Sequence, residues 1–292
     1  MKPPSPTYQK RAKTVLIIGA SGFIGNVLYK ELISYFDVYG TYANQVGVFK
    51  ENQVFYQYKV EDGGLDVILA EVQPTVIISI LRGDFKAQLK AQETILEYVI
   101  ATDAKVLYTS SVNVFDGKGA FPSYEDDTTL AESHYGRFKI SMERLLQTLP
   151  KKNYAILRLP LVLGVNSPRL FQLKQAIKHQ ASFEVFPNLI VSVTTADKIA
   201  QQVHYIINKE LSGVFHLSST DMVHHEELFK DISERLSAKT PIFKSAFSSN
   251  EDRYLAILSK HNKLPKAYRI SVAEVIEDST LKDEILTLKQ NQ

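Results

Sequence analysis

A short apolar run that passes directly into three evenly spaced glycines constrains the fold of this chain most. Residues 15–18 are Val-Leu-Ile-Ile, and Gly19, Gly22 and Gly25 follow with the spacing G-x-x-G-x-x-G. Apolar residues then recur at helical spacing as far as Ile33, so the stretch predicts a strand, a tight turn and a helix. A helix N-terminus offers unpaired N–H groups and a dipole that both favour an anion. The turn therefore predicts a site for the pyrophosphate of a dinucleotide.

Each glycine of this turn has a predicted role. Gly19 makes the tight turn, Gly22 lets the backbone approach the ligand, and Gly25 lets the helix pack against the strand. Any tight strand-to-helix turn favours glycine, so this pattern needs support from the rest of the chain. The residues assigned to the cofactor from this turn are Gly19, Ser21, Gly22, Phe23, Ile24 and Gly25.

Strands and helices alternate along the following residues. Strand patterns cover 37–42, 53–58, 75–80 and 106–111, and helical patterns cover 62–72, 84–102 and 134–149. Such alternation is typical of βαβ units and a parallel sheet. The predicted fold is α/β, a Rossmann-type doubly wound parallel sheet with a smaller C-terminal α/β substrate-binding lobe.

The second half of the chain has a weaker pattern. We assign residues 1–160 to an NAD(P)-binding domain and 161–292 mainly to the substrate-binding lobe, with about 190–217 packing back on the sheet. Helices are predicted at 169–180, 196–207 and 271–288, and a further helical stretch is predicted to end at 263–266.

Ligands of parallel sheets bind beyond the carboxyl ends of the strands. Leu81 and Arg82 follow the fourth strand and are assigned to the cofactor together with the glycine turn. The second strand ends at Thr41 and Tyr42 without the acidic residue that would bind the ribose hydroxyls of NAD. We therefore assign Thr41 and Tyr42 to the cofactor and expect NADP(H) to be favoured over NAD(H).

Tyr135 and Lys139 stand four residues apart on a predicted helix, so their side chains share one face. A tyrosine has a pKa of about 10, and an adjacent ammonium group favours its phenolate form, which makes it a usable proton donor near neutral pH. Ser111, at the end of a strand, is placed to bind the same substrate oxygen. For the pair alone, a solvated lysine on an amphipathic helix remains the alternative.

Composition excludes several classes of function. The chain has no cysteine, which excludes disulfides and thiolate metal sites. Lys and Arg total 34 against 32 for Asp and Glu, so no basic footprint for nucleic acid or an anionic membrane is expected. His224 and His225 have no partner at ligand spacing, so no metal site is expected. We expect a cytoplasmic protein that acts on a small molecule, with flanking helices that pair two copies in a homodimer.

The glycine turn, the strand-end serine and Tyr-x-x-x-Lys together resemble an extended short-chain dehydrogenase/reductase. Residues 110–117, Ser-Ser-Val-Asn-Val-Phe-Asp-Gly, followed by 135–139, Tyr-Gly-Arg-Phe-Lys, are similar to the dTDP-4-dehydrorhamnose reductase branch. The likeness continues through 157–164 and 213–218 and covers nearly the whole chain.

This resemblance implies a reductase that passes a hydride from NADPH to the 4-keto carbon of a nucleotide-activated sugar. Tyr135 would protonate the oxygen, and Ser111 would orient the carbonyl. Lys139 would hold the nicotinamide ribose and lower the pKa of the tyrosine. Asn113 and Arg169 are assigned to the substrate, Arg169 as a partner for its diphosphate, although a solvated helix face is the alternative for that arginine.

The chain departs from the branch in its substrate residues. Ser111-Val112-Asn113 stands where the branch usually has Thr-Asp-Tyr, and Leu161 replaces an aromatic residue. The helix asparagine of the proton relay has no counterpart, since Lys90 and Gln92 lie nearest. Two alternatives therefore remain open. One is a cofactor-binding regulatory subunit like that of methionine adenosyltransferase. The other is a sugar-nucleotide epimerase or dehydratase, although dehydratases often carry an acidic pair near the strand-end serine.

Overall fold

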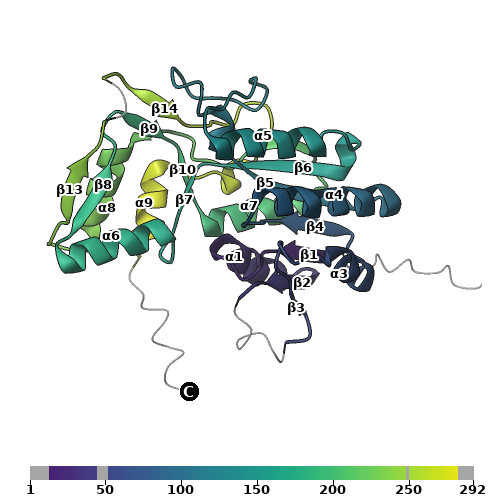
Figure 1. Cartoon of the computed structure of the whole chain (residues 1–292). Coiled ribbons are helices and arrows are strands. Elements are labelled where there is room, and N and C mark those ends of the chain that lie inside the picture. Colours follow the sequence, from purple (N-terminus) through teal and green to yellow (C-terminus); the bar gives the residue numbers. More distant parts are fainter. Residues whose placement is uncertain (1–12, 45–51, 248–249, 282–292) are drawn as a thin grey trace, which may run out of the picture.

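A parallel sheet of seven strands forms the centre of the molecule (Figure 1). The computed structural model describes residues 13–44, 52–247 and 250–281. The strand order is β11-β6-β5-β4-β1-β2-β3, and every neighbouring pair is parallel. The strands of this sheet are β1 (Thr14–Ile18), β2 (Asp37–Tyr42), β3 (Phe55–Gln57), β4 (Val76–Ser79), β5 (Lys105–Ser111), β6 (Tyr154–Leu159) and β11 (Gly213–His216).

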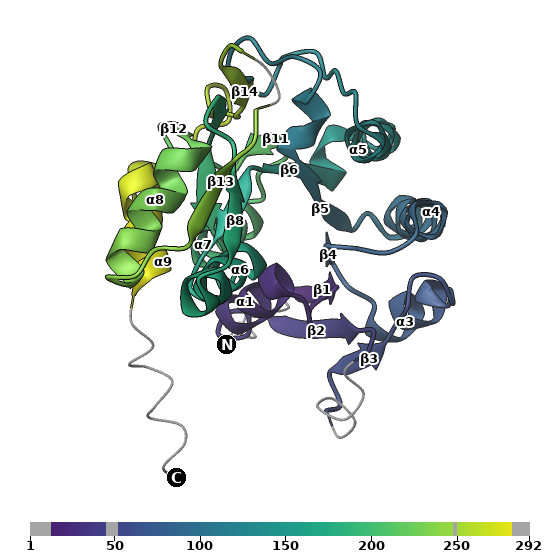
Figure 2. The same cartoon turned by 60° about the vertical axis from the view of Figure 1, so that its left-hand side comes forward.

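Helices cover both faces of this sheet (Figure 2). One face packs against helices α3, α4 and α5, and the opposite face packs against α1 and α7. The sheet is therefore doubly wound, and the predicted Rossmann-type α/β fold is confirmed. The bounds of these helices are α1 (Phe23–Leu32), α3 (Leu65–Val72), α4 (Phe85–Thr102), α5 (His134–Leu146) and α7 (Ala196–Asn208).

A second hydrophobic core lies beside the sheet, and it is built from helices and short strands of the second half of the chain (Figure 1). Its three small sheets are β7 with β10, β8 with β13, and β9 with β12 and β14. The elements are β7 (Leu161–Leu163), α6 (Pro168–His179), β8 (Ser182–Val185), β9 (Leu189–Val191), β10 (Val193–Thr195), β12 (Val223–His224), α8 (His225–Leu236), β13 (Ile242–Ser245), β14 (Arg253–Leu255) and α9 (Val272–Thr280).

The predicted helix boundaries differ from the structure most clearly at two places. The helix predicted over 62–72 begins only at Leu65, because Gly63 and Gly64 adopt φ of 73° and 81°. The helical stretch predicted to end at 263–266 is wrong: residues 260–262 form a bend, and the backbone N–H groups of Lys260 and His261 bind Glu125 instead of helix carbonyls. The last helix is described to Thr280, and the rest of the prediction lies outside the described residues.

Candidate active site

Two adjoining cavities open at the carboxyl edge of the central sheet. The larger has a volume of about 620 Å³ and the smaller about 200 Å³. Both are lined by Phe23, Ile24, Ile80, Leu81 and Arg82. The cavities therefore meet at the N-terminus of α1 and the end of β4, where the rule for parallel sheets places a ligand.

The smaller cavity is formed around the glycine turn. Gly19 has φ of 95° and donates its N–H to Thr41 Oγ1 at 2.9 Å, and a Cβ on it would lie 2.6 Å from the carbonyl oxygen of Ile80. A Cβ on Gly25 would lie 2.2 Å from the carbonyl oxygen of Gly19. Glycine is therefore required at Gly19 for the turn to approach the end of β4, and at Gly25 for α1 to pack this closely against the turn. All the residues predicted from the turn and the strand ends line this cavity: Gly19, Ser21, Gly22, Phe23, Ile24, Gly25, Thr41, Tyr42, Leu81 and Arg82.

The N-terminus of α1 suits a pyrophosphate. Gly22 is its N-cap and supplies no side-chain cap, and the first turn of this fully described helix holds no acidic residue. Its first N–H groups thus have no side-chain acceptor competing for them. The residues present fit the phosphates of a dinucleotide.

The smaller cavity also contains charged residues that the sequence analysis missed. Lys59 and Glu61 follow β3 and line it. Within the described residues the ammonium group of Lys59 forms no ion pair, whereas Glu61 accepts a hydrogen bond from the N–H of Asp84 at 3.0 Å. The backbone hydrogen bond from Asp84 lowers the pKa of Glu61. The sequence does contain a signal for these two residues. They follow β3, which is the parallel neighbour of β2, so the carboxyl end of β3 lies at the same edge of the sheet.

The larger cavity brings together Ser111, Tyr135 and Lys139. Ser111 ends β5, and the other two lie one turn apart on α5. The hydroxyl of Ser111 donates to Asn113 Oδ1 at 2.9 Å and accepts the N–H of Asn113 at 3.2 Å. The structure therefore unites the predicted catalytic residues with Asn113 in one wall.

The start of α5 is fixed against the end of β5. A Cβ on Gly136 would lie 2.2 Å from the carbonyl oxygen of Asn113, so only glycine allows this approach. Ser133 caps α5 by accepting the N–H of Gly136 at 2.9 Å, and the carboxylate of Asp116 accepts a hydrogen bond from the Ser133 hydroxyl. These contacts determine where Tyr135 stands relative to Ser111.

The electrostatics of this wall differ from the prediction in one respect. Burial raises the pKa of Tyr135, while Ser111 and Arg82 lower it. Lys139, which was predicted to lower it, instead directs its ammonium group to β5. Burial lowers the pKa of Lys139 itself to about 8, with Glu143 raising it and Arg82 lowering it further.

The predicted substrate residue Arg169 lines the larger cavity, but its guanidinium group contacts residues of the second core. It donates to the carbonyl oxygen of Glu184 at 2.7 Å and stacks 4.2 Å from the Phe183 centroid and 5.3 Å from that of Phe229. Arg169 is half-buried, so part of its side chain faces solvent beside these contacts. A diphosphate role would require these contacts to be shared with the ligand.

The helix amide nearest the site is Gln88. This residue of α4 lines the larger cavity and donates to the carbonyl oxygen of Gly83 at 2.8 Å, whereas neither Lys90 nor Gln92 lines it. Phe85, at the start of the same helix, lies 6.4 Å from the Tyr135 ring and completes this side of the wall.

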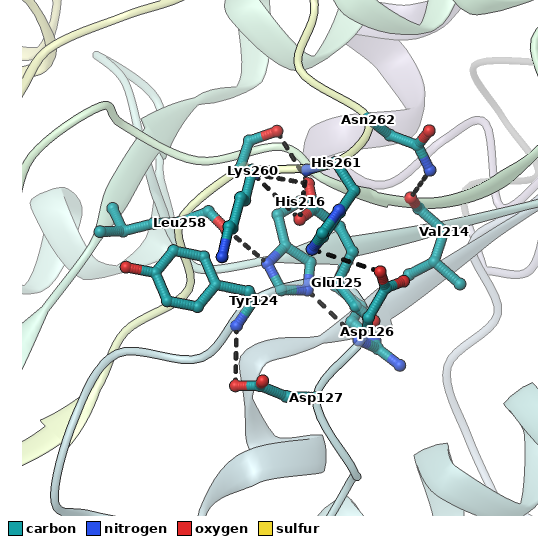
Figure 3. A network of polar contacts seen from close by, with 12 residues as sticks. Tyr124, Glu125, Asp126, Asp127, Val214, His216, Leu258, Lys260, His261 and Asn262 are labelled. Carbon is teal, nitrogen blue, oxygen red and sulfur yellow. Dashed lines mark hydrogen bonds and ion pairs between the residues drawn. The ribbon is translucent and has the colours of Figure 1, made fainter.

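The long loop after β5 is anchored by a buried carboxylate (Figure 3). Glu125 accepts hydrogen bonds from the hydroxyl of Ser259 at 2.8 Å and the N–H of Lys260 at 3.0 Å. Arg158 binds the carbonyl oxygen of Glu125 at 3.1 Å and approaches Nε2 of His216 at 3.3 Å. Burial, and next Arg158, lowers the pKa of His216 to about 4, so this histidine is neutral near pH 7. The network thus connects the loop with β6 and β11.

The part of the chain that the structure describes contains neither a candidate metal cluster nor a candidate membrane span. No group of three or more His, Cys, Asp or Glu side chains able to hold a metal ion occurs there. None of the helices described is both long and apolar enough to cross a membrane.

The fold and this wall define a class of protein, the extended short-chain dehydrogenases/reductases. A doubly wound parallel sheet carries a glycine turn at the end of its first strand, and Ser111, Tyr135 and Lys139 face the adjoining cavity. The model of the RmlD substrate binding domain family matches residues 13–274, so the chain belongs to this family. The predicted resemblance to the dTDP-4-dehydrorhamnose reductase branch is confirmed.

Solved structures share the fold at low sequence identity. A dTDP-4-dehydrorhamnose reductase from Yersinia enterocolitica is 22% identical over 92% of this chain and 100% of that chain, with a TM-score of 0.72. The reductase of Bacillus anthracis in complex with NADP is 18% identical over 92% and 98%, with a TM-score of 0.72. A UDP-glucose 4-epimerase from Thermotoga maritima is 19% identical over 94% and 99%, with a TM-score of 0.77. No curated protein sequence matches the chain significantly.

Proposed function

We propose that this protein is an NADP(H)-dependent reductase of a 4-keto nucleotide sugar or a related carbonyl compound. The observation that carries the proposal is the common wall of Ser111, Tyr135 and Lys139, which lies next to the cavity around the glycine turn. The nicotinamide cofactor would supply the hydride to the carbonyl carbon. Solved relatives named as dTDP-4-dehydrorhamnose reductases, one of them in complex with NADP, support this substrate class and cofactor.

The side chains of the wall have separate tasks in this proposal. Tyr135 donates its phenolic proton to the carbonyl oxygen, and Ser111 gives its hydroxyl hydrogen bond to the same oxygen in exchange for Asn113. Lys139 stays charged beside the tyrosine and binds the cofactor ribose. The raised pKa of Tyr135 keeps its proton in place until the oxygen gains negative charge.

The preference for NADP(H) rests on Lys59 together with the end of β2. Thr41 and Tyr42 place no acid at the end of β2. Lys59 brings a cation to the same cavity: it forms no ion pair among the described residues, although its charge contributes to lowering the pKa of Glu61. A 2′-phosphate would pair with that cation.

We expect NADPH at about 100 times its Kd to stabilise the protein by roughly 2.7 kcal/mol. Lys59→Ala should reduce the thermal shift with NADPH and leave that with NADH unchanged. Equal losses with both cofactors would refute the role of Lys59.

A cofactor-binding protein without turnover is the second candidate. The observation in its favour is that the hydroxyl of Ser111 already donates its hydrogen bond to Asn113 Oδ1. An epimerase, such as the relative solved with UDP-glucose, would use the same wall to oxidise and then reduce a sugar. An epimerase would interconvert two sugars without net consumption of NADPH, which separates it from a reductase.

The experiment that tests the proposal is NADPH oxidation measured against a panel of 4-keto nucleotide sugars. Turnover by the wild type that is lost in Tyr135→Phe and kept in Tyr98→Phe would support the proposal. Tyr98 is a suitable control because it lies on α4, away from the wall, where its hydroxyl donates to the carbonyl oxygen of Pro74. Activity that survives Tyr135→Phe would refute the assigned acid. A panel without any turnover, combined with a thermal shift by NADPH, would favour the second candidate.

The roles of the two halves of the chain, its location in the cell and its oligomeric state also remain proposals. We infer that residues 161–292 supply most of the substrate-binding lobe, and that residues 1–160 bind the cofactor. A cytoplasmic location and a homodimer also stay predictions. Size-exclusion chromatography with light scattering tests the dimer.

A further inference from the structure

The ammonium group of Lys139 is held by a second tyrosine. Its Nζ donates to the hydroxyl of Tyr108 at 3.0 Å and to the carbonyl oxygen of Thr109 at 2.9 Å. It lies 4.6 Å from the centroid of the Tyr108 ring but 5.7 Å from that of Tyr135. Tyr108 is 2% exposed and Lys139 is 5% exposed. The polar partners of this buried ammonium are therefore on β5, not on Tyr135.

Matching repeats on α5 and β5 produce this contact. Lys139 and Glu143 stand one turn apart on α5, and Tyr108 and Ser110 stand two residues apart on β5. Four helical residues rise about 6 Å and two strand residues span roughly 6.6 Å, so the two rows stay aligned. Ser110 Oγ donates to Glu143 Oε1 at 2.5 Å, which forms the second pair of the row.

We propose that Tyr108 is a positioning residue for Lys139, whose hydroxyl holds the ammonium group charged and in place at the wall of the larger cavity. The inference rests on the proposed function, in which Lys139 serves the cofactor ribose and Tyr135. An ammonium group has three N–H donors, and β5 accepts two of them through Tyr108 and Thr109. The third is left for a ligand in the cavity that Lys139 lines.

The hydroxyl of Tyr108 matters because burial outweighs the other influences and already lowers the pKa of Lys139 to about 8. Burial and Arg82 favour the neutral amine, whereas Glu143 on α5 favours the charged form. Tyr135 faces it from α5. A hydrogen bond to a buried charge typically changes an equilibrium tenfold or more, which corresponds to about one pKa unit. Loss of the hydroxyl would therefore lower the pKa of Lys139 further and favour the neutral amine.

The test is Tyr108→Phe, which removes the acceptor and keeps the ring. Lysine side chains labelled with ¹³C allow the pKa of Lys139 to be followed by NMR in the full chain, with the signal assigned through Lys139→Met. We expect the Lys139 pKa to fall by about one unit in Tyr108→Phe. Tyr98→Phe removes another partly buried tyrosine hydroxyl and should leave it unchanged. Where turnover is measurable, the high-pH limb of kcat should move to lower pH by the same amount.

A stability cycle makes the result independent of catalysis. Tyr108→Phe should lower the melting temperature, and adding Lys139→Met should restore it, because the loss comes from a buried ammonium group that keeps only one of its two acceptors. If Tyr108→Phe does not fold, a folded double variant supports the inference and an unfolded one overturns it. An unchanged Lys139 pKa, or a loss that Lys139→Met does not relieve, also overturns it. Failure of the proposed function would show instead as absent NADPH binding with the Lys139 pKa shift intact.

Discussion

The buried ion pair between Arg158 on β6 and Glu143 on α5 allows a quantitative prediction. Their side chains are 3% and 4% exposed, and the closest contact, Nη2 to Oε2, is 2.7 Å. Oε1 also accepts from Arg158 Nε at 3.0 Å and from the hydroxyl of Ser110 at 2.5 Å. In Glu143→Gln an amide replaces one of these oxygens, so the guanidinium group loses its counter-charge while it stays buried. Removal of one partner from such a pair costs about 3–5 kcal/mol.

The assay is thermal unfolding, in which this loss corresponds to a fall in melting temperature on the order of 10 °C. Asp103→Asn is the matched control, since the Lys152–Asp103 pair has the same 2.7 Å contact but side chains 68% and 67% exposed. Asp103 has φ of 58°, which asparagine tolerates, so the substitution changes only the charge. Exposed pairs contribute little and weaken in salt. Equal losses in the two variants would refute the argument from burial.

Three further predictions concern the turn, the loop anchor and the buried lysine. Gly25→Ala places a Cβ 2.2 Å from the carbonyl oxygen of Gly19, so we expect about 1–3 kcal/mol of destabilisation and a smaller thermal shift with NADPH; an unchanged melting temperature would contradict it. Burial raises the pKa of Glu125, but hydrogen bonds led by the N–H of Lys260 outweigh it and hold the pKa below the ordinary 4.5. The stabilisation by Glu125 is therefore fully present above pH 4.5 and is lost as the pH falls through its folded pKa. In urea titrations from pH 6 to 3, the free energy of unfolding should depend less on pH in Glu125→Gln than in the wild type. Lys139 has its pKa lowered from 10.5 to about 8, so the folded state binds fewer protons between these values and the free energy of unfolding should rise with pH there. Lys139→Met should abolish that rise, and a rise that persists would assign it to another group.

The parallel sheet could be predicted because its signals are local. A continuous apolar run marks β1, and glycines at fixed spacing mark the turn that follows. The rule that ligands bind at the carboxyl edge then placed residues from distant parts of the chain in adjoining cavities. Lys59 was missed only because the rule was not extended to β3.

The contacts within the wall were not accessible in the same way. That α5 has Lys139 and Glu143 on one face follows from the sequence, but its docking on the Tyr108–Ser110 face of β5 does not. Residues 260–262 are not helical for a related reason. The backbone N–H groups of Lys260 and His261 donate to Glu125, which lies in a loop more than 130 residues earlier in the chain. A helical pattern of apolar residues is a local signal, so it does not predict hydrogen bonds to partners this far away in the sequence.

The division of the larger cavity explains why chemistry can be inferred further than substrate. One wall consists of Ser111, Tyr135 and Lys139, which the parallel sheet and α5 hold in place. The other wall comes from the second core, and includes Arg169, Val191 and Leu255. The strands there are two to four residues long, too short for a periodic pattern. The proposed reductase and the alternative epimerase would both use the wall of the sheet, so selection of the proposed sugar would fall to the other wall, whose sequence pattern is weakest. Substitutions that change substrate choice without loss of hydride transfer should therefore map to the second core.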